Sequence, residues 1–567
     1  MHKITGRYSF RIAAAGVIVA GAAAGGIVAS GGAAAAAVAV PCDVPSLIAA
    51  ISAANTTPAD SSLSLSSGCV YSLTAQDNAT DGGNGLPVIT AAVSIAGNGA
   101  TITRSSGTAF RLFDVASTGS LSLSDVTASN GLANNGVSGG GAVFSRGPLS
   151  VTSTTFSGNS APSATGTSGG AINNSGPLTV SLSTFTGNSG QEGGGIFNQS
   201  TSAAATITDS TFSGNTATTF GGGAIVSADG TTNVARDTFS GNNATGAAGG
   251  GAIDNDATVD VTNSTFNGNT GGTNGGGAIQ NFGTAAITWS TFSGNNSPYG
   301  ANLHNDTTGA PMTVSESIVA DGGGGGSNCS GLPAIVDGGY NIDTGTSCGF
   351  STANHSQNNT NPDLGALAAN GGPTQTMALA SDSPAVNAIP VSVAGCSGST
   401  DQRGVSRPQG IACDIGAYEL IMQTPPSPSP SPTTSSSSPP PSGGPIRGFA
   451  GKCVDDFRAS TADRNKIDIW SCNGTAAQRF TFAANGELQV RGKCIDDRAF
   501  GRSGTKVILF TCNGGSNQRW THKANGEYVL AFRGLCLDDP AFSRTNGTQL
   551  VVWSCNGGAN QRWSLPA

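Results

Sequence analysis

The phrase Thr211-Phe212-Ser213-Gly214-Asn215 decides the fold, because it appears six times, with small variations, between residues 139 and 295. The spacings between its phenylalanines are 29, 27, 27, 27 and 26 residues, for Phe156, Phe185, Phe212, Phe239, Phe266 and Phe292. A repeat of this period indicates stacked units, none of which can bury its own apolar face.

Residue types indicate which stacked architecture this is. Gly, Ser, Thr and Asn dominate the repeats and strong helix formers are few, which excludes an α-solenoid. About 27 residues suffice for three short strands and three turns, one coil of a parallel β-helix with coils ~4.8 Å apart. A Val or Ile stands five residues before each Phe, at Val151, Val180, Ile207, Val234, Val261 and Ile287. Because five is an odd number, both columns can point inward only if the strand bends between them.

An asparagine follows each Phe by three residues, which predicts a ladder of stacked turns. Asn tolerates the left-handed conformation, and stacked amides can hydrogen-bond to the coils above and below. The ladder would contain Asn159, Asn188, Asn215, Asn242, Asn269 and Asn295.

A second phrase, Gly-Gly-Ala-Ile, alternates with the first and ends, for example, at Ile225 and Ile279. Together the two phrases resemble the repeats of right-handed parallel β-helix proteins, including polymorphic outer-membrane adhesins. The resemblance implies an all-β, right-handed parallel β-helix. It does not decide the chemistry, because that group contains both polysaccharide enzymes and adhesins.

The chain, at 567 residues, is too long for one ordinary domain. A Pro/Ser/Thr run in its second half cannot form a core and predicts an extended spacer. Apolar residues at helical spacing in Pro45–Asn55 predict a short helix that covers the first coil. We expect a signal peptide at 1–39, an N-terminal cap at 40–84, the β-helix at 85–320, its C-terminal cap at 321–420, a linker at 421–445 and a third domain at 446–567.

The predicted signal peptide has the usual three parts. Lys3, Arg7 and Arg11 precede an uncharged run, and Ala37-Val38-Ala39 offers a cleavage site. Retention of this segment as a membrane anchor is the alternative. If the segment is cleaved, we expect a secreted, extracellular protein without a membrane contact.

Cysteine usage agrees with export. All twelve cysteines follow the predicted signal, no Cys-x-x-Cys occurs and His is scarce, so we expect disulfides rather than a metal site, and no cofactor. Taken in order, the pairs are Cys42–Cys69, Cys329–Cys348, Cys396–Cys413, Cys453–Cys472, Cys494–Cys512 and Cys536–Cys555.

Charge divides the chain. Residues 40–420 hold 6 Arg, no Lys and 23 Asp or Glu, a net charge of −17, whereas residues 446–567 hold 16 basic and 10 acidic residues, a net charge of +6. The acidic body argues against nucleic acid as a partner. We expect a monomer, and the repeats of residues 446–567 indicate that it binds a polysaccharide or glycan.

Residues 446–567 contain three repeats. Cys453, Cys494 and Cys536 are each followed by an apolar residue and Asp-Asp, and each repeat closes with Gln-Arg-aromatic, as in Gln561-Arg562-Trp563. This pattern resembles the ricin-B-type lectin, or family 13 carbohydrate-binding module, over the whole segment. The resemblance implies a β-trefoil with three sugar pockets.

The resemblance also assigns roles. The first Asp after each opening Cys would accept hydrogen bonds from sugar hydroxyls, the aromatic before each closing Cys would stack on the sugar ring, and the amides before the last aromatic would add polar contacts. These residues are Asp455, Trp470 and Gln478 in the first repeat, Asp496, Phe510, Asn517 and Gln518 in the second, and Asp538, Trp553, Asn560 and Gln561 in the third.

Two departures from this pattern rank the pockets. The first repeat has Ala477 where the others have Asn, with Asp468 as a partial replacement, and the second has Phe510 as a smaller platform. We therefore rank the third pocket first, the first pocket second and the second pocket last. Trp520 and Trp563 are expected in the core, and the second Asp of each pair is expected in a turn.

The β-helix shows no recognisable catalytic motif. Arg236 stands one coil above Asp209 in the same column, which predicts a surface ion pair. Asp254, Asp256 and Asp260 could bind Ca²⁺, but turn formation is the favoured interpretation.

His304 and His355 are interpreted as surface residues. Two hypotheses remain. The β-helix is a non-catalytic rod for adhesion or display, or it carries the site of a polysaccharide lyase or glycoside hydrolase.

Overall fold

The structure is a computed structural model. It describes residues 37–566, apart from 58–60, 134–138, 163–167, 202, 307–310, 324–326, 422–443, 484–485, 498–502, 513, 524 and 532–533. Most of the predicted signal peptide and of the predicted linker therefore lies outside the described residues. The β-helix and the trefoil are described separately. No helix among the described residues is long and apolar enough to span a membrane.

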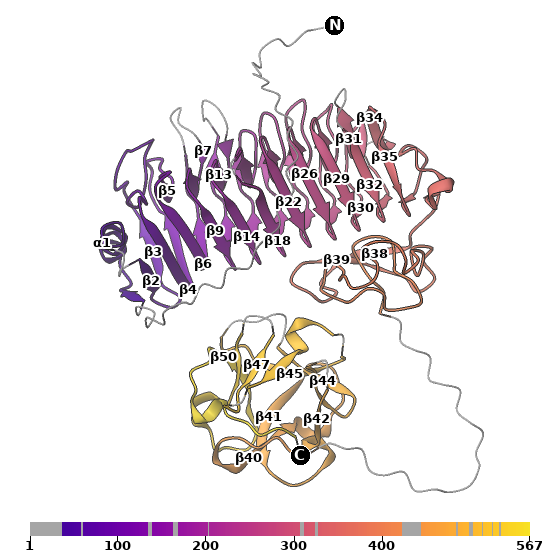
Figure 1. Cartoon of the computed structure of the whole chain (residues 1–567). Helices are drawn as coiled ribbons and strands as arrows, with labels where there is room; N and C mark the ends of the chain where they lie inside the picture. Colours follow the sequence, from indigo (N-terminus) through magenta and orange to yellow (C-terminus); the bar gives the residue numbers. More distant parts are fainter. Residues whose placement is uncertain are drawn as a thin grey trace, which may run out of the picture. The chain divides into compact units, whose positions relative to one another are not determined.

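The predicted parallel β-helix is confirmed (Figure 1). Its first ladder pairs strands in parallel along the whole β-helix, with the long strands β4 and β6 shared with the second ladder. The strands are β1 (Val38–Val40), β2 (Ser62–Leu65), β4 (Ala92–Arg104), β6 (Ser120–Ser129), β9 (Leu149–Thr152), β14 (Leu178–Ser181), β18 (Ala205–Thr208), β22 (Thr231–Ala235), β26 (Thr258–Thr262), β29 (Thr284–Thr288), β32 (Met312–Ser315) and β35 (Val336–Gly339).

The second ladder carries the Phe column. Its strands are β3 (Val70–Leu73), β10 (Thr155–Ser157), β15 (Thr184–Thr186), β19 (Thr211–Ser213), β23 (Thr238–Ser240), β27 (Thr265–Asn267), β30 (Thr291–Ser293), β33 (Ile318–Ala320), β36 (Ile342–Asp343) and β37 (Gln357–Asn358). Parallel pairing thus runs from Val38 to Asn358, beyond the expected limits of 85 and 320 at both ends.

The third ladder carries the Gly-Gly-Ala-Ile column. Its strands are β5 (Phe113–Val115), β8 (Val143–Ser145), β13 (Ile172–Asn174), β17 (Ile196–Asn198), β21 (Ile225–Ser227), β25 (Ile253–Asn255), β28 (Ile279–Asn281), β31 (Gly300–Asp306) and β34 (Ser327–Leu332). Short pairings close the turns, between β7 (Gly139–Gly140) and β12 (Ser168–Gly169) and among β11 (Ser160–Ala161), β16 (Ser189–Gly190), β20 (Thr216–Ala217) and β24 (Asn243–Ala244).

The predicted internal ladders are present. Neighbouring rings of the Phe column stack with centroids 4.6–5.0 Å apart, and all six phenylalanines are buried. The Val/Ile column is also buried and pairs in register. Arg236, between β22 and β23, supplies the predicted bend, because its φ of 62° is left-handed. Equivalent positions in other coils are left-handed too, at Ser153, Leu182, Asp209, Asn263, Trp289 and Glu316.

The asparagine ladder is confirmed as a chain of hydrogen bonds. The Nδ2 atom of Asn215 donates to Oδ1 of Asn242 at 2.9 Å, and Nδ2 of Asn242 donates to Oδ1 of Asn269 at 2.9 Å. The same Asn242 amide donates to the carbonyl of Phe212. Each buried amide therefore forms hydrogen bonds with the amides of the neighbouring coils, which offsets the free-energy cost of burying it.

A second asparagine ladder was not predicted. Asn255 Nδ2 donates to Oδ1 of Asn281 at 2.6 Å, and Asn281 Nδ2 donates to Oδ1 of Asn305 at 2.8 Å. These residues stand two positions after the Ile column, a spacing that the sequence displays.

Helix α1 (Val44–Ala54) covers the first coil, as expected. Asp43 caps it by accepting from the Ser46 amide at 2.8 Å, and the helix buries Leu47 and Ile51. Val38 and Ala39 of the predicted cleavage site lie in β1, so cleavage after Ala39 would remove most of that strand.

The C-terminal cap folds back along the last coils. Its hairpin is β38 (Leu364–Ala368) and β39 (Thr376–Leu379). Thr238 Oγ1 donates to the carbonyl of Gln375 at 2.5 Å, and Thr265 Oγ1 donates to Oε1 of Gln402 at 2.6 Å. The cap thus forms hydrogen bonds with threonines that directly precede the phenylalanines of the Phe column.

The C-terminal β-trefoil is also confirmed. Its core contains Trp520 and Trp563, as expected, and each indole Nε1 donates to a backbone carbonyl. Its strands are β40 (Lys452–Asp456), β41 (Asn465–Ser471), β42 (Phe480–Phe482), β43 (Leu488–Val490), β44 (Lys493–Asp497), β45 (Val507–Phe510), β46 (Trp520–His522), β47 (Tyr528–Leu530), β48 (Cys536–Asp538), β49 (Thr548–Gln549) and β50 (Val551–Trp553).

Candidate functional site

One hairpin in each trefoil repeat places the candidate residues on a common face. In the third repeat Cys536 lies opposite Trp553 across an antiparallel pair, and Asp538 follows Cys536 by two residues. Residues two apart on a strand point to the same side, so Asp538 and Trp553 share one face. The same register brings together Asp455 with Trp470 and Asp496 with Phe510.

The third pocket holds its carboxylate with two amides. Asn560 Nδ2 and Gln561 Nε2 donate to Oδ2 of Asp538 at 2.9 and 2.8 Å. Both amides come from the short 3-10 helix Ala559–Gln561, and Gln561 also donates to the carbonyl of Ser554. The indole of Trp553 is 46% exposed, which leaves it available as a platform.

The second pocket repeats this arrangement with a smaller ring. Asn517 Nδ2 and Gln518 Nε2 donate to Oδ2 of Asp496 at 3.0 and 2.7 Å. Phe510 is only partly exposed. The second pocket therefore has the same polar set as the third and a poorer platform.

The first pocket differs in its charge. Gln478 Nε2 donates to Oδ1 of Asp455 at 2.9 Å, and Ala477 supplies no amide. Asp468 lies directly opposite Asp455, fully buried, with Oδ2 3.1 Å from Nζ of Lys466. The first pocket thus replaces an amide with a carboxylate–ammonium pair.

Unpartnered amide oxygens mark the second and third pockets. Among the described residues, the buried Oδ1 atoms of Asn517 and Asn560 have no hydrogen-bond partner. Buried polar atoms are normally satisfied, so these oxygens are suited to accept hydrogen bonds from a ligand.

Burial raises the pKa of the three pocket carboxyls, and the pocket amides lower it in part. The pKa of Asp496 rises to about 6, and that of Asp468 also rises to about 6 through burial. With a pKa of about 6, Asp496 and Asp468 are mainly ionised at pH 7 and can accept hydrogen bonds from hydroxyl donors.

The second Asp of the first two pairs lies at a strand end, which corrects the prediction, whereas Asp539 precedes the turn Pro540–Phe542, as expected. Asp456 and Asp497 lie at the ends of strands β40 and β44 and are fully buried. Asp456 accepts from Nδ2 of Asn465 at 2.6 Å. Asp539 follows β48 and is also buried. The sequence could not separate a buried strand end from a turn, because Asp is usual in turns.

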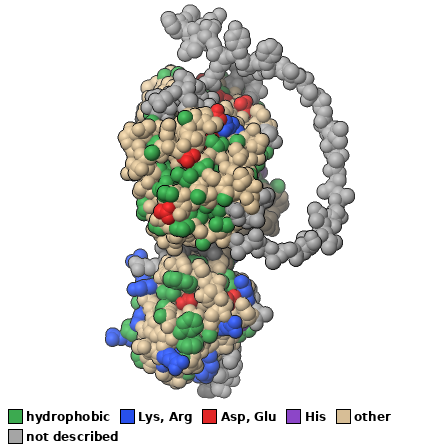
Figure 2. Space-filling view, turned by 90° about the vertical axis from the view of Figure 1, so that its left-hand side faces the viewer, with side chains coloured by type: hydrophobic (Ala, Val, Ile, Leu, Met, Phe, Trp, Pro, Cys, Tyr) green, Lys and Arg blue, Asp and Glu red, His purple; other side chains and the backbone are tan. Residues whose placement is uncertain are grey.

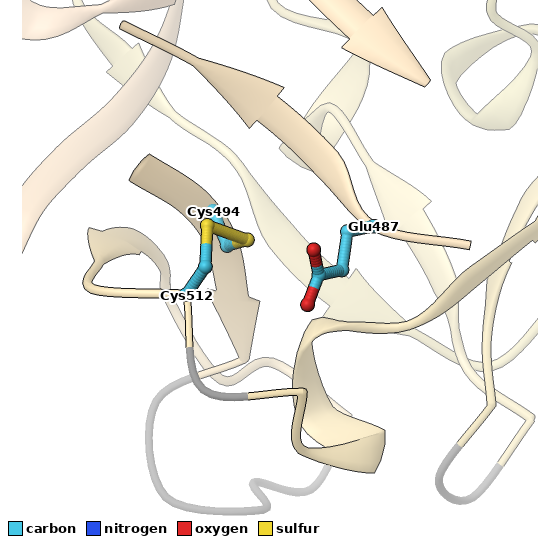
Figure 3. Close-up of side chains that lie close together, drawn as sticks. All are labelled: Glu487, Cys494 and Cys512. Carbon is cyan, nitrogen blue, oxygen red and sulfur yellow. A yellow bond between two sulfur atoms is a disulfide. The ribbon is translucent and has the colours of Figure 1, made fainter. Parts of the chain in front are cut away.

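All six predicted disulfides are present. Glu487 lies beside the Cys494–Cys512 bridge, with its carboxylate directed toward the sulfurs (Figure 3). Glu527 is placed in the same way beside Cys536 and Cys555. Because the sulfurs are bonded to each other, they are not thiolate metal ligands. Glu527 Oε1 instead accepts from the Gly557 amide at 3.1 Å, and this contact orders the turn after the closing Cys.

In the β-helix the predicted ion pair is present, with Nη2 of Arg236 2.7 Å from Oδ2 of Asp209. The aspartates that were considered for Ca²⁺ binding are divided between two ladders, because Asp254 lies in strand β25 and Asp260 in β26.

The interpretation of His304 as a surface residue is wrong. It lies in β31, is 8% exposed and contacts Ser330. The strand pattern of the sequence gives no sign that this polar side chain is buried.

Charged side chains distinguish the two bodies. Lys and Arg are frequent on the visible surface of the trefoil and rare on that of the β-helix (Figure 2), in line with the net charges of the two segments.

Comparison with known proteins supports the trefoil. Residues 442–563 match the ricin-type beta-trefoil lectin domain. A segment of 53 residues is 36% identical to Serine protease 1 of Rarobacter faecitabidus and covers 9% of this chain and 10% of that protein. The chain therefore spans about a tenth of the length of that relative.

Solved structures also align with a part of the chain. The designed three-fold symmetric protein ThreeFoil is 28% identical, with 22% of this chain and 96% of that chain covered and a TM-score of 0.21. The agglutinin from Abrus precatorius is 24% identical, with 24% of this chain and 51% of that chain covered and a TM-score of 0.21.

Proposed function

We propose that this chain is a secreted carbohydrate-binding protein, in which a lectin trefoil is displayed on a β-helix that serves as an adhesion rod. The observation that carries the proposal is the Asp–Gln pair beside an aromatic, repeated on one face of three hairpins. The family match over residues 442–563 supports it.

The third pocket has the chemistry that a sugar needs. Both amides contact Oδ2 of Asp538, and Oδ1 of the same carboxylate is the atom that we expect to accept from a sugar hydroxyl. The unpartnered Oδ1 of Asn560 offers a second acceptor. Trp553 can cover the apolar face of the ring.

The rod and its secretion are supported by the structure of the chain. Six disulfides suit an oxidising compartment. In the β-helix columns, phenylalanine rings stack and asparagine amides form hydrogen bonds from coil to coil, and such contacts make a support rigid. The alternative, a polysaccharide lyase or glycoside hydrolase, needs a converging set of catalytic groups on the β-helix.

A glycan array with the full chain tests the proposal and identifies the sugar. The chain with Asp455, Asp496 and Asp538 all changed to Ala should lose every array signal while remaining folded. Asp306→Ala, an exposed carboxylate on the β-helix, is the matched control and should bind like the parent. Binding that survives in the triple variant would contradict the proposal.

A further inference from the structure

A polar row crosses the last four coils on the third ladder. Asp254, Gln280, His304 and Ser330 are paired in register on β25, β28, β31 and β34. The preceding residues of these strands, such as Ile253, belong to the core, so the row points away from it. Neighbouring members are about one strand spacing, ~4.8 Å, apart.

The end of this row is a hydroxyl–imidazole pair. His304 Nδ1 lies 2.6 Å from Oγ of Ser330, which is within hydrogen-bond distance. His304 is nearly buried, and Ser330 is partly exposed. The exposed ring of Tyr299 stands edge-on to the imidazole, with the ring centroids 6.0 Å apart.

The row contains a further sign of a ligand site. Gln280 is fully buried next to His304, and among the described residues its side-chain oxygen and nitrogen have no hydrogen-bond partner. An unsatisfied buried amide costs free energy and is rarely kept without a function.

The imidazole is in the state that can accept a proton. Burial lowers the pKa of His304, and the nearby Asp306 carboxylate opposes this in part. The ring is therefore neutral at pH 7. With its proton on Nε2, Nδ1 is free to accept the Ser330 hydroxyl proton.

We propose that Ser330 and His304 are the nucleophile and general base of a hydrolytic site for small acyl esters on the outer face of the β-helix. Ser330 Oγ attacks the ester carbonyl carbon as its proton passes to His304 Nδ1. The alcohol leaves with that proton, and the acyl group stays on Ser330. Water then gives a proton to His304 and its oxygen to the acyl carbon, which releases the acid and restores the Ser330 hydroxyl.

The acyl esters that this site would meet are those on the hydroxyls of a bound glycan, a part that rests on the proposed function. The ester chemistry itself does not. An ester without a sugar therefore tests the hydrolytic site alone, and its outcome neither supports nor contradicts carbohydrate binding.

The experiment uses the full chain with p-nitrophenyl acetate and a fluorophosphonate probe. We expect hydrolysis above the buffer rate and a single adduct on the peptide that contains Ser330. His304→Gln should lower the rate by about 100-fold or more, the usual range for a lost general base. Ser330→Ala should abolish both the adduct and the hydrolysis.

Ser327→Ala is the matched control, because Ser327 is exposed on the same strand. It should keep the parent's rate and adduct, and melting temperatures show that all variants are folded. The proposal is overturned if the folded parent forms no adduct on Ser330, or if Ser330→Ala hydrolyses the ester as fast as Ser327→Ala.

Discussion

The β-helix and the trefoil are both built from repeats, yet the columns of the β-helix stack equivalent residues on one another, whereas the pocket residues of the trefoil contact partners in their own repeat. Phe239 stacks on Phe212 and Phe266, its counterparts in the neighbouring coils. In the trefoil, Asp538 contacts Asn560 and Gln561 of its own repeat. Repetition in the β-helix therefore builds continuous columns from coil to coil, whereas repetition in the trefoil builds a shared core and also multiplies a candidate site. A change in the first should spread to neighbouring coils, and a change in the second should stay local.

The largest expected effect is on the Phe column. Phe239→Ala removes a buried ring with stacked neighbours on both sides and should lower the free energy of unfolding by about 3–5 kcal/mol. Chemical denaturation of the β-helix measures this loss. Ser240→Ala, the next residue, is partly exposed and should cost much less. Equal stability of Phe239→Ala and the parent would mean that the column does not carry the core.

The next effect is on binding, and the variants should remain folded. Asp538→Ala removes the carboxylate of the pocket ranked first, and hydrogen bonds to charged groups contribute about 1.5–3 kcal/mol, so affinity should fall at least about tenfold. Isothermal titration with the sugar found on the array measures it. Asp496→Ala, beside the smaller Phe510 platform, should do less. The reverse order of the two variants would refute the ranking of the pockets.

A third prediction concerns an exception within a β-helix column. Asp237 replaces the serine found at this position in neighbouring coils, such as Ser210 and Ser264, and is fully buried. Burial raises its pKa well above the ordinary value, although backbone amides of Ser210 and Ala235 oppose this. A carboxyl with a raised folded pKa binds more protons in the folded state, so stability falls as pH rises above the unfolded pKa of about 4.

Asp237→Ser should therefore be more stable than the parent at pH 7, because a serine fits the column without a buried charge. The advantage should grow from about pH 4 upward, by at most about 1.4 kcal/mol per pH unit, until the folded pKa is passed. Melting temperatures from pH 3 to 8 measure it. A constant difference across this range would show that Asp237 does not titrate in the folded protein as described.

The smallest expected effect is on the surface ion pair of Arg236 and Asp209, both partly exposed. A double-mutant cycle with Arg236→Ala and Asp209→Ala should give a coupling of about 0.2–1 kcal/mol, reduced by salt. A coupling above this range would show that this contact between coils contributes more than a solvent-exposed ion pair.

Much of this comparison could be read from the sequence. The Phe and Asn ladders follow from spacing alone, and the odd separation of the Phe and Val columns required the bend found at Arg236. The polar set of each trefoil pocket followed from the triplicated motif. In both cases the information lies within one repeat.

Other features depend on contacts between distant residues. The cap binds Thr238 and Thr265 through Gln375 and Gln402, more than 100 positions later, and no local pattern shows such a contact. The buried Asp456 and His304 were misjudged because the burial of a polar side chain outside the core columns has no sequence period. The second asparagine ladder, by contrast, was visible in the spacing and was missed.

The matching of successive coils has a consequence for the length of the rod. Phe212, Phe239 and Phe266 are separated by 27 residues each, and each coil presents the same Phe and Asn to both neighbours. Excision of one period would join two surfaces that already fit, and duplication would do the same. The length of the β-helix can therefore be decreased or increased in steps of ~4.8 Å, one coil at a time, without redesign of its ends.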